Sequence, residues 1–281
     1  MKVYPFKIPK AQNIGLIYQE DKEIVFYDKL HQHDEIQISY IARGEGTLIV
    51  GDAVKDYSCG DIIVVGANQP HLFKSDLRFS EESYMISLFF TKESFGELFF
   101  ELDDFKILKT FFQWAAVSFK VIQPETRLRA YFSELSYRSS FERFIIFMKI
   151  LEFITFCEKE KLSSMSYANE LSDREGKRMR NIIDYTLNNF HLPTNLATIA
   201  SIANLSTNSF CRYFKQRTNK TYTVFLNEIR VEYACKLLRS SDALVLEISE
   251  RCGFNNISNF NRKFKELKGV PPSQYRIAQP N

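Results

Sequence analysis

The sequence predicts an α+β protein in two parts. A small N-terminal β-barrel with following helices is expected first, and then an all-α region of two bent helix pairs joined by a long helix. Three observations predict this fold class: short alternating strand patterns fill residues 14–90, helical spacing of apolar residues begins near residue 93, and a segment near the carboxyl end is repeated after about 50 residues. The 281 residues suffice for two domains of roughly 100–200 residues each.

The strand region combines period-2 alternation with β-branched runs at residues 36–41, 47–50, 62–65 and 84–90. Turn signals separate these runs, among them Gly51-Asp52 and Gly60-Asp61. Short strands at this spacing indicate a small barrel or sandwich.

The following region, residues 93–162, shows two apolar faces with helical spacing. The first comprises Phe95, Leu98, Phe99 and Leu102, and the second Phe141, Phe144, Ile145, Met148, Leu151 and Thr155. These faces either pack on the barrel or form a dimerisation seam of paired helices. The polar segment 163–173 is a predicted linker, which divides the chain into domains at 1–162 and 174–281.

The repeat lies within the helical end. Ile199, Ala200, Ala203, Asn204 and Leu205 correspond to Ile248, Ser249, Cys252, Gly253 and Phe254, 49 residues later; Phe210, Arg212, Phe214, Lys215 and Phe225 correspond to Phe260, Arg262, Phe264, Lys265 and Tyr275, 50 residues later. Each copy predicts a short helix, a tight turn at Asn204 or Gly253, which tolerate positive φ, and an amphipathic helix, 207–217 or 256–268. Residues 221–239 form the long helix between the copies.

Charge is distributed unevenly along the chain. Residues 172–281 contain 17 Lys and Arg against 9 Asp and Glu, a net charge of +8, whereas residues 1–171 carry −5. The exposed faces of the two amphipathic helices also carry amide and guanidinium groups, which can read base edges. A plain helical repeat with solvated polar faces would explain the apolar spacing, but not the paired turns, the matching arginines and the basic excess together. We therefore expect double-stranded DNA as the partner of this end.

From residue 178 to 276 the sequence resembles the AraC/XylS family of transcription regulators. The most specific matches are Ile248-Ser249-Glu250-Arg251-Cys252-Gly253-Phe254, Phe260-Asn261-Arg262-Lys263-Phe264-Lys265 and Gly269-Val270-Pro271-Pro272-Ser273-Gln274-Tyr275-Arg276. Asn219 stands where the family usually has glycine. The resemblance implies two helix-turn-helix units whose recognition helices enter successive major-groove segments ~34 Å apart.

This resemblance, with the polar faces, assigns the DNA contacts. Expected base contacts are Asn208, Cys211, Arg212, Asn256, Ile257, Ser258, Asn261 and Arg262. Expected phosphate contacts, which position without specifying, are Lys215, Arg217, Lys263 and Lys265.

Three histidines of the barrel region, His31, His33 and His71, are spaced as in cupins, the sensor barrels of many family members. Metal-binding cupins add a glutamate, but Gln37 stands at its likely position. We therefore expect a pocket for a small effector, lined by His31, His33, Gln37, Tyr40 and His71, and assign no metal or other cofactor. A metal held by the three histidines is the weaker alternative.

Five scattered cysteines without a CxxC pair predict reduced thiols, and neither an apolar leader nor a membrane span is evident. We expect a cytoplasmic, bacterial protein that is not an enzyme. The leading hypothesis is an effector-controlled, sequence-specific transcription regulator that forms a homodimer. It is expected as an activator that contacts RNA polymerase, and the sequence leaves activation against repression open. A cupin-type metalloenzyme fused to a DNA-binding domain and an architectural DNA binder are the alternatives.

Overall fold

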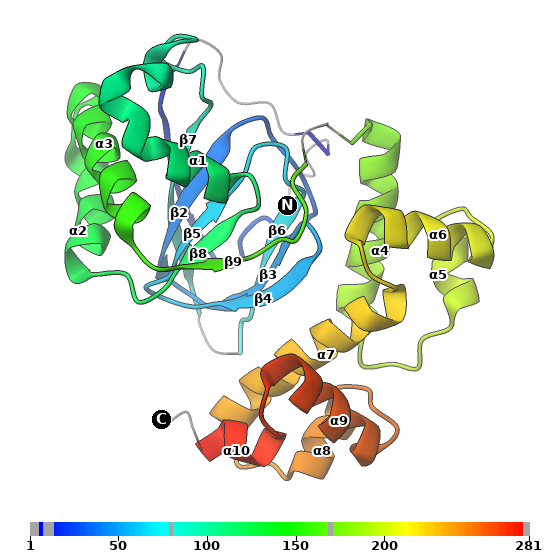
Figure 1. The fold of residues 1–281 in the computed structure, drawn as a ribbon. Helices are drawn as coiled ribbons and strands as arrows, with labels where there is room; N and C mark the ends of the chain where they lie inside the picture. The colour runs from blue at the N-terminus through cyan, green and yellow to red at the C-terminus, as the bar shows by residue number, and fades with distance from the viewer. Residues whose placement is uncertain (1–5, 8–13, 79–80, 168–170, 278–281) are drawn as a thin grey trace. The chain divides into compact units, whose positions relative to one another are not determined.

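The computed structural model describes residues 6–7, 14–78, 81–167 and 171–277, and the chain forms two compact units, residues 1–176 and 177–281 (Figure 1). The first unit combines two β-sheets with helices, and the second is helical. The α+β class predicted from the sequence is confirmed.

The first unit contains two antiparallel sheets. The larger has the strand order β1-β7-β2-β5-β8-β9, and the smaller has the order β4-β3-β6. The strands are β1 (Ile17–Glu23), β2 (Ile36–Arg43), β3 (Gly46–Val50), β4 (Ala53–Tyr57), β5 (Ile62–Val65), β6 (His71–Ser75), β7 (Ser83–Phe90), β8 (Phe119–Val121) and β9 (Lys159–Lys161). Strands β8 and β9 were not expected, because three residues are too few to show a period.

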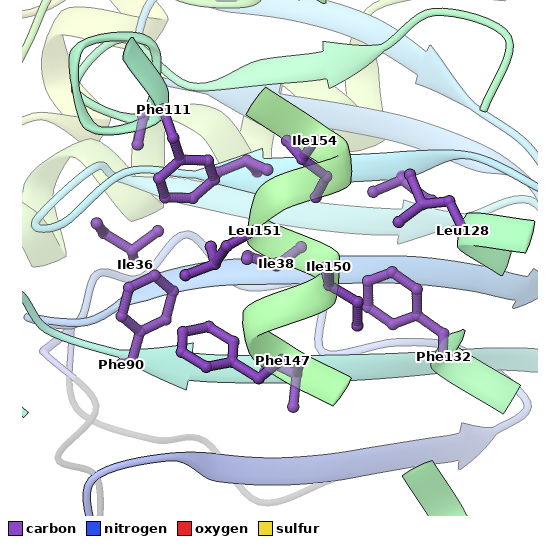
Figure 2. Packing of buried hydrophobic residues seen from close by; sticks show 14 of the residues in the cluster. Ile36, Ile38, Phe90, Phe111, Leu128, Phe132, Phe147, Ile150, Leu151 and Ile154 are labelled. Atoms are coloured by element: carbon purple, nitrogen blue, oxygen red, sulfur yellow. The ribbon is translucent and has the colours of Figure 1, made fainter. Parts of the chain in front are cut away.

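Helices cover one face of the larger sheet. They are α1 (Lys109–Ala115), α2 (Thr126–Glu134) and α3 (Ser140–Phe156), with the 3₁₀ turns η1 (Phe99–Glu101), η2 (Asp103–Leu108) and η3 (Leu135–Tyr137). Figure 2 shows α3 packing Phe147, Ile150, Leu151 and Ile154 against the sheet. The ring centroids of Phe147 and Phe90 on β7 are 4.7 Å apart. A second apolar cluster, with Ile41, Val50 and Phe73, fills the space between the two sheets.

Alternation along β2 decides which side chains reach each layer. Ile36 and Ile38 belong to the cluster beneath the helices, whereas Ile41 belongs to the cluster between the sheets. Gln37 and Ser39 have the parity of Ile41. The side chains at the odd-numbered positions of this strand therefore point into the interior of the barrel.

Two sequence expectations for residues 93–162 need correction. The helical face from Phe95 to Leu102 does not form, because Gly96 has a φ of +112°, which no α-helix accommodates, and Leu98 is 73% exposed. The second face is only partly turned to the core: α3 buries Leu151 and Thr155 but leaves Phe141 73% and Ile145 42% exposed. Phe141 and Ile145 are thus left at the surface of this unit, on a face of α3 that also carries the exposed Lys149 and Glu152.

The second unit contains seven helices within the described residues. They are α4 (Asp173–Asn189), α5 (Leu196–Ile202), α6 (Thr207–Thr218), α7 (Tyr222–Ser240), α8 (Val245–Arg251), α9 (Ile257–Lys268) and α10 (Pro272–Ile277). The first residues of α4 belong to the first unit. Within the described residues, no helix combines the length and apolar character needed to cross a bilayer.

The repeat is visible in the packing. Phe214 lies 5.4 Å from Phe225 between ring centroids, and the equivalent pair Phe264 and Tyr275 is also 5.4 Å apart. The turns match as well, since Asn204 and Gly253 have φ of +54° and +81°. The two helix-turn-helix units, α5–α6 and α8–α9, are therefore copies of one motif joined by α7.

Candidate nucleic-acid interface and barrel site

The first recognition helix, α6, is held by its apolar face and presents a polar one. Ser206 begins the helix by accepting a hydrogen bond from Ser209 N at 3.3 Å, and Phe210 and Phe214 are fully buried. The opposite face is exposed and carries Asn208, Cys211, Arg212 and Lys215. These four predicted DNA contacts therefore share one surface. Arg217 differs, since its guanidinium lies 5.9 Å from the ring centre of Tyr213.

The second recognition helix, α9, exposes a matching face with Ser258, Asn261, Arg262 and Lys265. The Arg262 guanidinium donates to Asn259 Oδ1 at 2.8 Å, which orients it along the exposed face. Asn259 is also exposed and was not predicted as a site residue, although its spacing from Arg262 on a helix could have indicated it.

Three other predicted contacts on α9 have structural roles. Asn256 is the N-cap, and its Oδ1 accepts from Ser258 N at 2.8 Å and Asn259 N at 3.1 Å. Ile257 packs against the apolar cluster of this unit. Lys263 donates to Glu266 at 2.8 Å, a hydrogen bond that lowers the pKa of Glu266. A phosphate at Lys263 would therefore compete with an ionised carboxylate.

The three barrel histidines gather in the first unit. His31 and His71 pair through their backbones, and ring centroids are 4.3 Å apart between His31 and His71, 5.0 Å between His33 and His71, and 6.2 Å between His31 and His33. Each Nδ1 bonds a backbone carbonyl two residues away: His31 with Lys29 at 2.8 Å, His33 with Glu35 at 2.9 Å and His71 with Gln69 at 2.8 Å. Because a carbonyl oxygen only accepts hydrogen bonds, each of these Nδ1 atoms carries a proton. The Nε2 atom is then the ring nitrogen through which each histidine can contact another group.

A buried polar chain continues from this cluster. His33 Nε2 lies 3.1 Å from Gln37 Oε1, the Gln37 amide donates to Ser39 Oγ at 2.7 Å, and Ser39 and Ser87 hydroxyls are 2.8 Å apart. All four side chains are at most 4% exposed. Ser39 and Ser87 were not predicted, although Ser39 shares the strand parity of Gln37. Imidazole, amide and hydroxyl groups together can hydrogen-bond a small polar molecule.

Tyr40 does not join the cluster. It has the opposite strand parity and packs on the helix side of the sheet, where its ring centroid is 5.6 Å from that of Phe132. Burial raises the pKa of Tyr40, so the hydroxyl is neutral there. The structure therefore brings together His31, His33, Gln37 and His71 and leaves Tyr40 outside the barrel interior.

Two family profiles match the chain. A helix-turn-helix domain of the AraC type covers residues 199–278, and a cupin domain covers residues 25–78. The chain therefore combines a cupin domain with an AraC-type helix-turn-helix domain. Its cupin domain contains the histidine cluster, and its AraC-type domain contains α6 and α9.

Known proteins resemble the AraC-type domain most clearly. The MmsAB operon regulatory protein of Pseudomonas aeruginosa is 33% identical over 92 residues, 33% of this chain and 30% of that protein. The activator RhaR of Cronobacter sakazakii is 21% identical over 248 residues, 88% of this chain and 86% of RhaR. The matched segments span about a third of the regulatory protein from Pseudomonas and of YdeC from Bacillus subtilis.

Two solved structures are among those that match the chain. The DNA-binding domain of AdpA, solved in complex with a target DNA, is 31% identical over 34% of this chain and 87% of that chain, with a TM-score of 0.33. ToxT from Vibrio cholerae covers 95% of this chain and all of its own at 16% identity, with a TM-score of 0.39.

The side chains of the histidine cluster decide whether a metal fits there. In the described part of the chain, no group of three or more His, Cys, Asp or Glu side chains has the geometry to hold a metal ion. Gln37 supplies an amide where a metal-binding cupin has a carboxylate, and its oxygen faces His33. The donor set of this cluster therefore does not fit a resident metal.

Proposed function

We propose that this protein binds specific duplex sequences through α6 and α9 and thereby regulates transcription. The observation that carries the proposal is the pairing of two recognition helices, each with an exposed arginine, Arg212 or Arg262, at the same place in the repeat. The basic charge of this end supports it. The base and phosphate contacts expected from the sequence remain part of the proposal, with Arg262, Asn261, Arg212 and Asn208 as base readers on the exposed faces.

Selection of bound duplexes from a random pool by the full chain, repeated at two salt concentrations, tests this function. We expect an enriched sequence with two elements, because each helix reads its own groove segment. We also expect affinity to fall at higher salt, since phosphate contacts release counterions. A pool that shows no enrichment at either salt concentration contradicts the proposal.

The proposed control lies in the cupin domain, which takes up a small polar effector at the cluster of His31, His33, Gln37 and His71. The segment that follows this domain, proposed as the linker 163–173, supports such coupling. Gln32 lies between two of the histidines and bonds Leu171, and Gln69, whose carbonyl accepts from His71, donates to Met165 O at 3.3 Å. An effector that displaces these histidines would alter the anchoring of the linker.

The linker is also attached at its start. Asp52, in the turn between β3 and β4, accepts from Ser163 Oγ at 2.7 Å and from Ser164 N at 2.8 Å. A thermal-shift screen with small metabolites tests for the effector, because a ligand that binds only the folded state raises the apparent stability. A hit that leaves the affinity for the selected duplex unchanged argues against control by this site.

We propose a homodimer that assembles through α3. Phe141 and Phe156 are 73% and 71% exposed on this helix. A groove of about 540 Å³ along α2 and α3 includes Phe156 and is lined by both aromatic and charged side chains, namely Tyr131, Phe153, Glu125, Arg127, Lys149 and Glu152. The exposed phenylalanines on one helix, together with the groove at Phe156, favour a second copy as the occupant.

The proposal also assigns roles to the two domains, a location and a mode of output. Residues 1–162 serve sensing and dimerisation, and residues 174–281 serve DNA binding. The protein acts in the cytoplasm of a bacterium, where its DNA is, and an enzymatic role is not proposed because Gln37 replaces the carboxylate of metal-binding cupins. Activation through RNA polymerase is the mode that we propose for its output.

A further inference from the structure

Where α4 ends, one arginine of α7 holds the end of that helix. Arg230 donates from Nε to Phe190 O at 2.7 Å and from its terminal nitrogen to Leu192 O at 3.0 Å. These carbonyls follow the last turn of α4, where backbone acceptors lack helical partners. Burial lowers the pKa of Arg230, and two charge-assisted hydrogen bonds offset that desolvation.

The same guanidinium contacts the second helix-turn-helix unit. It lies 5.6 Å from the ring centre of Phe254, which directly follows the turn between α8 and α9 and is 3% exposed. One turn along α7, Tyr233 packs on Phe190 with ring centroids 4.8 Å apart. Arg230 therefore connects the end of α4 with the turn of the second unit.

Helix α4 belongs to the first half of the DNA-binding domain. Thr186 on α4 and Tyr222, at the start of α7, have their hydroxyls 3.0 Å apart. Arg178 on α4 lies 5.3 Å from the ring centre of Tyr213 on α6. A contact between the end of α4 and the second turn is thus a contact between the two halves.

Gly253 makes this contact close. A Cβ on Gly253 would lie 2.8 Å from the carbonyl oxygens of Phe190 and His191, where no real Cβ fits. Asn204, the equivalent residue in the first turn, has a Cβ and the same left-handed backbone. The two turns therefore have the same backbone conformation. In the second turn, the absence of a Cβ at Gly253 also lets the backbone at the end of α4 pack directly against it.

We propose that Arg230 and Gly253 are positioning residues that fix the orientation of α9 relative to α6, and thereby the spacing of the two DNA elements that the protein accepts. The proposal rests on the proposed function. Neither residue reads a base; both act through the turn that carries α9. A cavity of about 270 Å³ lined by Arg230, Gly253 and Asn255 lies beside them, so the second unit has space to shift when the contact is weakened.

The test uses the full chain and the duplex that it selects. Base pairs are inserted or deleted, one or two at a time, between the two elements, and affinity is measured for each spacing. We expect the native chain to lose roughly tenfold in affinity when the spacing changes by one base pair, since the two grooves move apart and rotate. Arg230→Ala should flatten this profile, while the base preferences within each element stay as they were.

Arg239→Ala is the matched control. Arg239 is also on α7, but it donates to Tyr275 Oη at 3.3 Å within the second half. It should keep the native spacing profile. Arg230→Lys, which retains the cation but cannot bridge two carbonyls as a guanidinium fork does, should lie between the native chain and Arg230→Ala.

A second pair of variants covers the case in which Arg230→Ala does not fold. Gly253→Ala should flatten the spacing profile, and Asn204→Gly should not. An unchanged profile in folded Arg230→Lys and Gly253→Ala, or an equal flattening by Arg239→Ala, overturns the proposal. If the native chain selects no duplex at all, the proposed function is wrong. That outcome is distinguishable from failure of the positioning proposal, because it is seen with the native chain alone, whereas the positioning proposal is tested by comparing variants.

Discussion

The side chain of Gln32 makes two hydrogen bonds with the backbone of Leu171, donating from Nε2 to the carbonyl at 3.3 Å and accepting from the amide N–H at 3.4 Å. Gln32 is fully buried, so these bonds are made away from water. They join the segment that carries His31 and His33, between β1 and β2, to the segment that leads into α4.

Gln32→Ala should lower the free energy of unfolding of the first unit by about 1–3 kcal/mol, because it leaves buried backbone groups unpaired. Denaturant unfolding monitored for the cupin domain measures this loss. Gln19→Ala is the control, since the Gln19 amide bonds the nearby Asp21 on β1 and its loss should cost less. Equal losses for the two variants would show that the contact with Leu171 has no special weight.

This contact marks the limit of what the sequence predicts. Gln32 and Leu171 are 139 residues apart, and Gln69 and Met165 are 96 apart, so no local pattern relates them. The helix-turn-helix repeat was predictable because its signals are local: buried phenylalanines four residues apart, and a turn that needs Asn or Gly.

Other site residues were predictable in part. Strand parity places Gln37 and Tyr40 on opposite faces of β2, so the pattern alone separates them once the strand is assigned. Asn256 illustrates the opposite difficulty, because an asparagine before a helix suits both a cap and a base contact. Gly96 prevented the expected helix by a positive φ, which a helical spacing of apolar residues does not reveal.

Glu20 should make the first unit sensitive to acid. Its carboxylate accepts hydrogen bonds from the Tyr18 hydroxyl at 2.5 Å and the Tyr84 hydroxyl at 2.7 Å. The bond from Tyr18 has the largest effect, and together with Tyr84 and Lys22 it lowers the pKa of Glu20 to about 2 from an ordinary 4.5. Because the pKa of Glu20 is lower in the folded state than in the unfolded state, its ionised carboxylate stabilises the fold at pH values above about 4.5. This stabilisation is lost as the pH falls from about 4.5 to about 2.

Comparison of Glu20→Gln with the native chain by thermal unfolding across pH measures that contribution. The native chain should be the more stable of the two near neutral pH, and the difference should shrink as the pH falls through this window. A difference that stays constant with pH would mean that the charge of Glu20 contributes nothing.

Asn219 ends α6 in the left-handed region at a φ of +54°, as Gly269 ends α9 at +79°. Asn219→Ala should lower the free energy of unfolding of the DNA-binding domain by about 1 kcal/mol, because alanine lacks the polar side chain that makes this region accessible to asparagine. Chemical denaturation of the full chain, followed through the second unit, measures the change.

Gly269→Ala is the control for that variant. A Cβ at Gly269 would meet nothing within 4 Å, so its loss of stability reports the backbone conformation alone. Asn219→Gly should remain close to the native chain. A native-like Asn219→Ala together with a destabilised Gly269→Ala would show that the end of α6 rearranges at no cost.

Phe141→Glu combined with Phe156→Glu should convert the proposed dimer into a monomer, because both rings are exposed on α3 and charges there oppose burial against a second copy. Sedimentation velocity measures the mass, and the melting temperature at high dilution should stay unchanged. Leu98→Glu is the control, since Leu98 is 73% exposed but lies outside α3. A native chain that sediments as a monomer would refute the dimer itself.

Arg262 and Lys265 should separate the two kinds of DNA contact on α9. Arg262 is exposed and held toward the surface by Asn259, so Arg262→Ala should cost about 1–3 kcal/mol on the selected duplex and much less on a scrambled one. Lys265 is exposed one turn later, and Lys265→Ala should weaken both duplexes alike and reduce the salt slope by about 1. Titrations at several salt concentrations distinguish these outcomes. If Arg262→Ala weakens both duplexes equally, the arginine contacts phosphate, and base reading by α9 must then come from Asn261 and Ser258.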